Sequence, residues 1–195
     1  SAKVVQSGQG ADEVFAGYFW YPLMNAATGS DLERFRPLYF DRSHAEFLET
    51  VHPDYQGEDH TSHTIAQLLA QAGADEFLDN VLRMDVTTLI VDDPVKRVDN
   101  MTMAWGLEAR VPFLDHHLVE FAATMPPDLK LKQQGKHPLK EVARRLLPAA
   151  VIDRPKGYFP VPALKYVRGE FWVFMRDILN SDKCRQRQLF QRAYV

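Results

Sequence analysis

The chain has 195 residues, 46% of them hydrophobic, so it can bury a sizeable core as one domain or form most of a larger one. Its net charge of −3 gives no overall basic field to attract nucleic acid. The single cysteine, Cys184, excludes an internal disulfide framework and a four-cysteine zinc site. No apolar run approaches the roughly 20 residues that span a bilayer, and no secretion signal opens the chain. We therefore expect a soluble cytoplasmic protein with neither nucleic acid nor a membrane as a partner.

The chain opens on a short apolar stretch, Val4-Val5, which predicts a buried strand leading into a glycine-rich turn. A lone strand at a terminus has no partner for its backbone groups and is only marginally stable. We therefore expect the natural protein to continue upstream, with this chain as its carboxy-terminal part. The exposed strand edge also favours self-association, so a homodimer is a further expectation.

Hydrophobic spacing and proline or glycine breakers predict a series of helices after this strand. The chain should therefore be mostly α-helical. The polar tail after Ser181 is expected to be frayed. In chain order, the predicted helices run from Asp12 to Leu23, from about Leu32 towards Val51, from a cap at Thr61 or Ser62 to Gly73, from Phe77 to a stop before Pro94, through Asn100 and Met103, from Asp115 to Met125, from Lys136 to Leu147, and from Ala163 to about Leu179.

A glycine-rich motif, Ser-Gly-Gln-Gly-Ala-Asp-Glu at residues 7–13, occupies the junction between strand and helix. Glycines allow close backbone approach, and N–H groups at a helix start attract phosphate or carboxylate. Asp12 is acidic where a phosphate loop is usually basic, which makes sense if Mg²⁺ lies between carboxylate and phosphate. The alternative is an ordinary helix cap, which spacing alone favours because short glycine-rich motifs are common.

A second cluster runs from Lys96 to Asp115. Glu108 and Arg110 flank an alanine inside an apolar segment, and charges placed in this way are usually paired, because an unpaired buried charge is costly. We interpret these two as a structural ion pair. Arg97 and Asp99 are better candidates for facing a substrate.

Two further clusters are basic. Gly135 and Lys136 open a basic helix, where a lysine opposes the helix dipole unless an anion is also present. The segment Arg154 to Pro160 holds two cations beside aromatic residues and could bind a phosphate or carboxylate. The alternatives are a solvated basic face for the first cluster and a turn docked by its rings for the second.

Together, the four clusters resemble the synthetase domain of glutamine-dependent asparagine synthetases. That family carries Ser-Gly-Glu-Gly-Ser-Asp-Glu followed by Gly-Gly-Tyr, similar to Ser7 to Tyr18. Its Leu-Glu-x-Arg-x-Pro-Phe-Leu-Asp signature is similar to Leu107 to Asp115. Its Lys-x-x-Leu-Arg helix is similar to Lys136 to Pro148, and its closing Arg-x-Lys-x-Gly-Phe loop to Arg154 to Phe159. The likeness covers nearly the whole chain.

The resemblance implies a mostly α-helical fragment of an α/β adenine-nucleotide α-hydrolase-like (PP-loop ATPase) synthetase domain. Such enzymes activate a carboxylate with ATP and Mg²⁺, and ammonia released from glutamine in another domain then forms the amide. By this resemblance, Lys136 and Gln9 are the catalytic candidates, with Lys136 stabilising charge on the leaving pyrophosphate. The implied nucleotide contacts are Ser7 and Gly8, the implied Mg²⁺ and nucleotide ligand is Asp12, and the implied substrate contacts are Arg97, Tyr18, Arg154 and Lys156.

The chain also departs from the family pattern. The pyrophosphate loop and the amino-terminal cysteine nucleophile are absent, so we expect residues 1–195 alone neither to hydrolyse glutamine nor to turn over ATP. Gln9 replaces a glutamate, and glutamine carries no charge and cannot act as a base. This change suggests a different acyl acceptor. The segment from Asp153 to Pro162 looks more like the N-acetylglutaminylglutamine amidotransferase branch, which we favour over asparagine synthesis.

An alternative from another class is a helical interaction module that has lost catalysis. Asp12, Lys136, Arg154 and Lys156 argue against it, because a scaffold has no need of them together.

Overall fold

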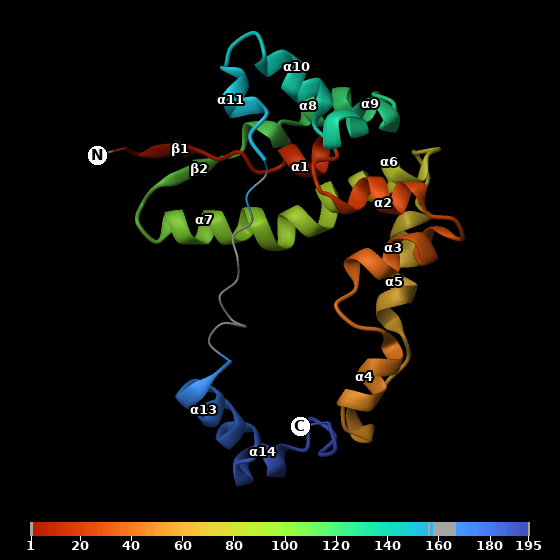
Figure 1. Ribbon diagram of the computed structural model, residues 1–195, viewed down its shortest axis with the longest axis vertical. Helices are drawn as coiled ribbons and strands as arrows, with labels where there is room; N and C mark the ends of the chain where they lie inside the picture. Colours follow the sequence, from red (N-terminus) through yellow and green to blue (C-terminus); the bar gives the residue numbers. More distant parts are fainter. Residues whose placement is uncertain (1, 156, 158–166, 195) are drawn as a thin grey trace. The chain divides into compact units, whose positions relative to one another are not determined.

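The computed structural model describes residues 2–155, 157 and 167–194. The chain divides into two compact units, Ser1–Tyr39 with Thr61–Asp153, and Phe40–His60 with Arg154–Val195. The described residues are mostly helical, as the sequence predicts, and contain one small sheet (Figure 1). No helix in this part of the chain is long and apolar enough to cross a membrane.

The sheet of the first unit joins two strands that are far apart in the sequence. Strand β1 (Val4–Gln6) pairs in parallel with β2 (Glu108–Arg110), with Val5 opposite Ala109. The expectation that Val4-Val5 has no partner in this chain is therefore wrong. Glu108 and Arg110 are exposed on β2, so the expectation of a buried ion pair between them is also wrong. The desolvation cost that would require such a pair does not arise on this face.

A long bent helical stretch crosses beside β2 (Figure 1). It consists of α6 (Phe77–Met84), two π-helical segments (Asp85–Leu89 and Val91–Val95) and α7 (Lys96–Met103). The predicted stop before Pro94 is wrong, because the helical path continues through this proline. Proline cannot donate the backbone hydrogen bond of a regular helical turn, and its ring crowds the preceding turn. The wide π turns replace the regular hydrogen-bond pattern here, so the helical path can include Pro94.

The single helix predicted from Asp12 to Leu23 is instead two helices, α1 (Ala11–Val14) and α2 (Trp20–Ala26). Between them Ala16 adopts a left-handed backbone conformation, with φ of 54°, which ends the first helix. The remaining helices of the first unit are α3 (Asp31–Tyr39), α5 (His60–Leu69, whose first residue belongs to the second unit), α8 (His116–Ala123), α9 (Pro127–Leu131), α10 (His137–Ala143) and α11 (Ala149–Ile152).

Helix α1 is held in an apolar cluster. Val14 and Phe15 are buried against Ala122 of α8. Because α1 has only one turn, its position depends on this packing rather than on its own hydrogen bonds. Partly buried residues surround the cluster, among them Val86, Phe113, Leu114, Leu118, Val119, Met125 and Leu139.

The second unit contains α4 (His44–Thr50), α13 (Gly169–Leu179) and α14 (Asp182–Arg187). Ser43 caps α4 in a capping box with Glu46, so the helix predicted from Leu32 towards Val51 is interrupted before this cap. The prediction of a frayed tail is wrong, because Ser181 caps α14 through the amide of Cys184. Residues 163–166 of the last predicted helix lie outside the described residues.

A backbone contact joins the end of α1 to the start of α10. The Lys136 amide donates to the carbonyl oxygen of Phe15 at 2.8 Å. Gly135 has φ of +91°, and a Cβ at this position would lie 2.0 Å from the carbonyl oxygen of Ala16. Only glycine combines this backbone conformation with so close an approach.

We predict that Gly135→Ala destabilises the first unit by about 2 kcal/mol or more, because the substitution adds both backbone strain and a backbone clash. Urea unfolding followed by tryptophan fluorescence measures the effect. Gly57→Ala is the control, since a Cβ there meets nothing within 4 Å. Equal unfolding midpoints for the two variants would show that the Gly135 contact is not required.

Candidate active site

An ion pair between the first and third sequence clusters forms the centre of the site. Asp12 Oδ1 lies 3.0 Å from Lys136 Nζ, and both side chains are partly exposed. Lys136 precedes α10 in a left-handed conformation, with φ of 56°. Gly17 lies against the pair, where a Cβ would come within 2.2 Å of Asp12 Oδ1 and 2.8 Å of Lys136 Cε. The fold therefore brings these two predicted site residues together, and a side chain at position 17 would displace them.

Hydrogen bonds from Ser7 and Gln9 hold the glycine-rich loop in place. The backbone N–H of Ser7 donates to the carbonyl oxygen of Arg110 at 2.8 Å, so this amide extends the sheet and is not available to a phosphate. Gly8 is exposed, and a Cβ there would meet nothing within 4 Å. The Gln9 Nε2 atom donates to the carbonyl oxygen of Pro94 at 3.1 Å. Gly8 is thus the residue of the loop that a ligand can approach, whereas the Gln9 side chain is hydrogen-bonded to the bent helix.

Tyr18 lies next to this centre and is oriented by a buried acid. Its hydroxyl donates to Glu13 Oε1 at 2.5 Å, and its ring stacks on Trp20 with centroids 4.3 Å apart. Burial, followed by the hydrogen bond to Glu13, raises the pKa of Tyr18 above its usual value. Tyr18 is therefore a neutral hydrogen-bonding group here. Asp12 and Glu13 are adjacent on α1, so one helical turn places one acid on Lys136 and the other on Tyr18.

A second buried acid, Asp85, was missed in the sequence analysis. Its Oδ2 accepts from the hydroxyl of Tyr21 at 2.6 Å and from the hydroxyl of Tyr39. Asp85 is fully buried, and desolvation raises its pKa to about 7. A signal was present in the sequence, because Asp85 lies four residues after Val81 on the buried face of the helix. An acid at such a position requires hydrogen-bond partners.

The remaining predicted substrate residues are not joined to this centre. Arg97 on α7 pairs with Asp93, 3.1 Å away and one turn earlier, and both side chains are exposed. Arg154 is exposed and belongs to the second unit. Lys156 lies outside the described residues. The roles of these three stay predictions.

The acidic residues do not form a complete metal site by themselves. Within the described part of the chain there is no group of three or more histidine, cysteine, aspartate or glutamate residues that could hold a metal ion. Mg²⁺ is commonly bound by one or two carboxylates together with phosphate oxygens and water. Asp12 fits that pattern only where a phosphate ligand supplies the other oxygens.

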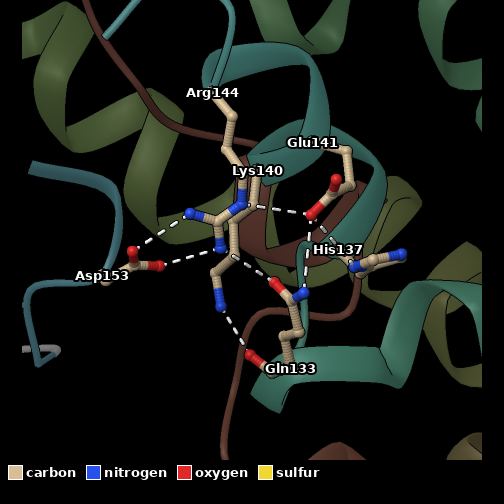
Figure 2. A network of polar contacts seen from close by, with 6 residues as sticks. All are labelled: Gln133, His137, Lys140, Glu141, Arg144 and Asp153. Carbon is tan, nitrogen blue, oxygen red and sulfur yellow. Dashed lines mark hydrogen bonds and ion pairs between the residues drawn. The ribbon is translucent and has the colours of Figure 1, made fainter. Parts of the chain in front are cut away.

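A polar network holds α10, the helix that Lys136 precedes (Figure 2). Arg144 makes a two-pronged contact with Asp153, with N–O distances of 3.0 and 2.9 Å, and its Nε donates to Glu141. The hydrogen bonds from Arg144 hold the pKa of Asp153 below its usual value. Lys140 donates to the carbonyl oxygen of Gln133, and burial and then the charge of Lys136 lower its pKa. Lys140 and Arg144 thus make hydrogen bonds to residues outside the helix, instead of forming only a solvated face.

Comparison with known proteins assigns the chain to a family. The asparagine synthase family profile matches residues 1–195, so the chain belongs to this family. A Mycobacterium bovis protein named "Putative asparagine synthetase (glutamine-hydrolyzing)" is 30% identical over 88% of this chain and 32% of its own length. Asparagine synthetase (glutamine-hydrolyzing) of Mus musculus is 44% identical over 51% of this chain and 22% of its own length. Asparagine synthetase (glutamine-hydrolyzing) 1 of Bacillus subtilis is 35% identical over 51% of this chain and 16% of its own length.

The chain thus spans about a third or less of the length of these relatives. No solved structure matches it.

The raised pKa of Asp85 predicts a pH-dependent stability. The ordinary pKa of this group is 3.8 and the folded value is about 7, so the folded state binds the proton more tightly. The stabilisation from this group is fully present below about pH 4 and is lost as the pH rises through 7. Relative to Asp85→Asn, the wild type should lose on the order of 3 kcal/mol of unfolding free energy between pH 4 and 8.

Urea unfolding at a series of pH values measures this difference. Asp92→Asn is the control, since it removes a carboxylate from an exposed position of the same helical stretch. A wild type and an Asp85→Asn variant with parallel pH profiles would contradict the assignment.

Proposed function

We propose that the protein containing this chain is an ATP-dependent carbon–nitrogen ligase. It would adenylate a carboxylate and form an amide with ammonia derived from glutamine. The observation that carries the proposal is the Asp12–Lys136 pair, built by two sequence clusters of an asparagine synthase family member. Both side chains are partly exposed, so a ligand can reach them.

Lys136 and Asp12 have different proposed roles towards the nucleotide. The Lys136 ammonium faces the growing negative charge on the leaving pyrophosphate and stabilises it more in the transition state than in the ground state. Asp12 is the residue that would hold Mg²⁺ together with a phosphate ligand. Mg²⁺ supplies charge neutralisation there. Gly8 gives the nucleotide close access to the backbone, and the Ser7 side chain is the adjacent contact.

The proposed acyl acceptor is N-acetylglutaminylglutamine. The neutral Gln9, in place of the glutamate of the asparagine synthetase motif, supports an acceptor other than aspartate. Tyr18 is proposed to line the acceptor pocket. Arg97, Arg154 and Lys156 are the proposed candidates for binding the carboxylate of the acceptor. Aspartate is the second candidate acceptor, because the relatives are named asparagine synthetases.

A non-catalytic interaction module is the alternative from another class, and the close packing of the site argues against it. Gly17 and Gly135 each leave room for the Asp12–Lys136 pair or for the backbone that carries it. A scaffold would not need an ion pair of this kind in a partly exposed position. We also propose a homodimer, since the hydrophobic residues of β1 are exposed at the edge of the sheet.

Pyrophosphate release by the full-length protein tests the acceptor. With ATP, Mg²⁺ and glutamine, release should be stimulated more by N-acetylglutaminylglutamine than by aspartate. Stimulation by aspartate alone would rule out the dipeptide and leave asparagine synthesis. Absence of stimulation by any carboxylate would favour the interaction module.

In the same assay, we predict that Lys136→Met lowers kcat by about a hundredfold or more, since it removes a charge that acts on the leaving group. Lys132→Met, which alters an exposed lysine near the same helix start, is the matched control and should retain activity. Comparable losses in the two variants would remove Lys136 from the proposed role.

A further inference from the structure

The second unit contains a small pocket of about 250 Å³. One wall is formed by the end of α13 and by α14, which contributes Cys184 and Arg185. The other wall is formed by His52, which lies just beyond α4, and by Phe190 and Arg192, which lie beyond α14. Every described residue of the lining belongs to the second unit, so the pocket is a feature of one compact body.

Backbone hydrogen bonds hold the two walls of this pocket together. The amide of His52 donates to the carbonyl oxygen of Leu189 at 3.0 Å. Val51 and Phe190 form an antiparallel bridge beside this hydrogen bond. Gln188, the residue that ends α14, has a left-handed backbone with φ of 49°. The pocket therefore has walls that main-chain contacts keep at a fixed distance from each other.

The charged groups that line the pocket are basic. Arg185 and Arg192 line it, and none of the other described lining residues is aspartate or glutamate. Two like charges beside one small pocket disfavour each other, and an anion placed between them removes this cost. A guanidinium group also presents its N–H donors in a planar fork that matches the oxygens of phosphate. The pocket is therefore suited to an anion with several oxygen atoms.

Two acidic residues lie near these basic groups, and neither lines the pocket. Asp182 Oδ1 is 3.8 Å from Arg185 Nη1, and the Asp182 side chain is 89% exposed. Exposed ion pairs of this length are weak, so a ligand can compete for Arg185. Asp54 Oδ2 is 3.5 Å from His52 Nδ1, and the backbone N–H of Asp54 donates to the same nitrogen at 3.3 Å. A neutral His52 ring that accepts at Nδ1 carries its proton on Nε2, which makes it a further donor.

We propose that this pocket binds a phosphate ester, with the phosphoryl group between Arg185 and Arg192 and a short apolar remainder against Leu179 and Phe190. A phosphoryl group carries nearly two negative charges at neutral pH, which matches two guanidinium groups. Leu179 and Phe190 line the pocket and are 37% and 43% exposed, so a ligand can cover them. Sites for drug-sized ligands measure about 300–1,000 Å³, so this smaller pocket takes a small ester. The proposal does not depend on the ligase reaction.

Cys184 lines the pocket, so its alkylation in the full-length protein reports on this site and not on a nucleotide site elsewhere. Iodoacetamide labels the thiol at about pH 8, and mass spectrometry of the peptide that contains Cys184 gives the rate. Inorganic phosphate and butyl phosphate are the probes, with sodium chloride keeping the ionic strength constant. Both should slow the labelling, and butyl phosphate should act at the lower concentration because its chain covers apolar surface.

Substitution of each arginine tests whether the pocket itself holds the phosphoryl group. In Arg185→Gln and in Arg192→Gln, the phosphate concentration that halves the labelling rate should rise about tenfold or more, the usual effect of losing a charge-assisted hydrogen bond. Arg187→Gln is the matched control, because Arg187 is exposed on the same helix and does not line the pocket.

Four results would overturn the proposal. Labelling rates of wild type that do not change with phosphate would show that no phosphoryl group enters the pocket. Equal protection of wild type, Arg185→Gln and Arg192→Gln would place the bound phosphate elsewhere. Stronger protection by succinate than by phosphate would replace the phosphoryl group with a carboxylate. Butyl phosphate that protects no better than inorganic phosphate would remove the apolar remainder.

Discussion

The close contact between two backbone segments is the constraint on which the site depends. Ala16 and Gly17 lie against Gly135 and Lys136, and the amide of Lys136 donates to Phe15. This contact places the Lys136 ammonium on Asp12, although the two residues come from opposite ends of the first unit. Apolar packing of α1 on α8 and the polar network on α10 hold the two segments in place. A side chain at Gly135 would meet the backbone of Ala16 and separate them.

The sequence predicts the parts of the site that short motifs carry. Residues 7–13 and the Gly135-Lys136 pair are recognisable because glycine, acidic and basic residues stand at fixed offsets, and the structure joins Asp12 to Lys136. Helical content follows from hydrophobic spacing, which is a local property of the chain. Whether Asp12, Ser7 or Gly8 contacts a nucleotide stays a prediction, because no ligand contact follows from these distances.

The features that the sequence does not reveal depend on contacts between distant segments. Strand β2 is only three residues long and becomes a strand because β1 lies beside it. The helix continues through Pro94 because its turns widen, a choice that local propensity disfavours. Ala16 is left-handed where the chain passes close to Gly135, whereas alanine by itself favours a helix. Gln9 illustrates the same limit, since its type is visible in the sequence but its partner, Pro94, is not.

Lysine acetylation of the full-length protein, measured by mass spectrometry with and without Mg²⁺ and ATP, tests most directly whether the Asp12–Lys136 pair is a nucleotide site. Phosphate contacts to the Lys136 ammonium would shield it from the reagent, and the exposed Lys132 provides an internal reference in the same protein. Our account predicts that nucleotide slows the modification of Lys136 and leaves that of Lys132 unchanged. Equal modification of Lys136 with and without nucleotide, at a concentration that supports pyrophosphate release, would contradict it.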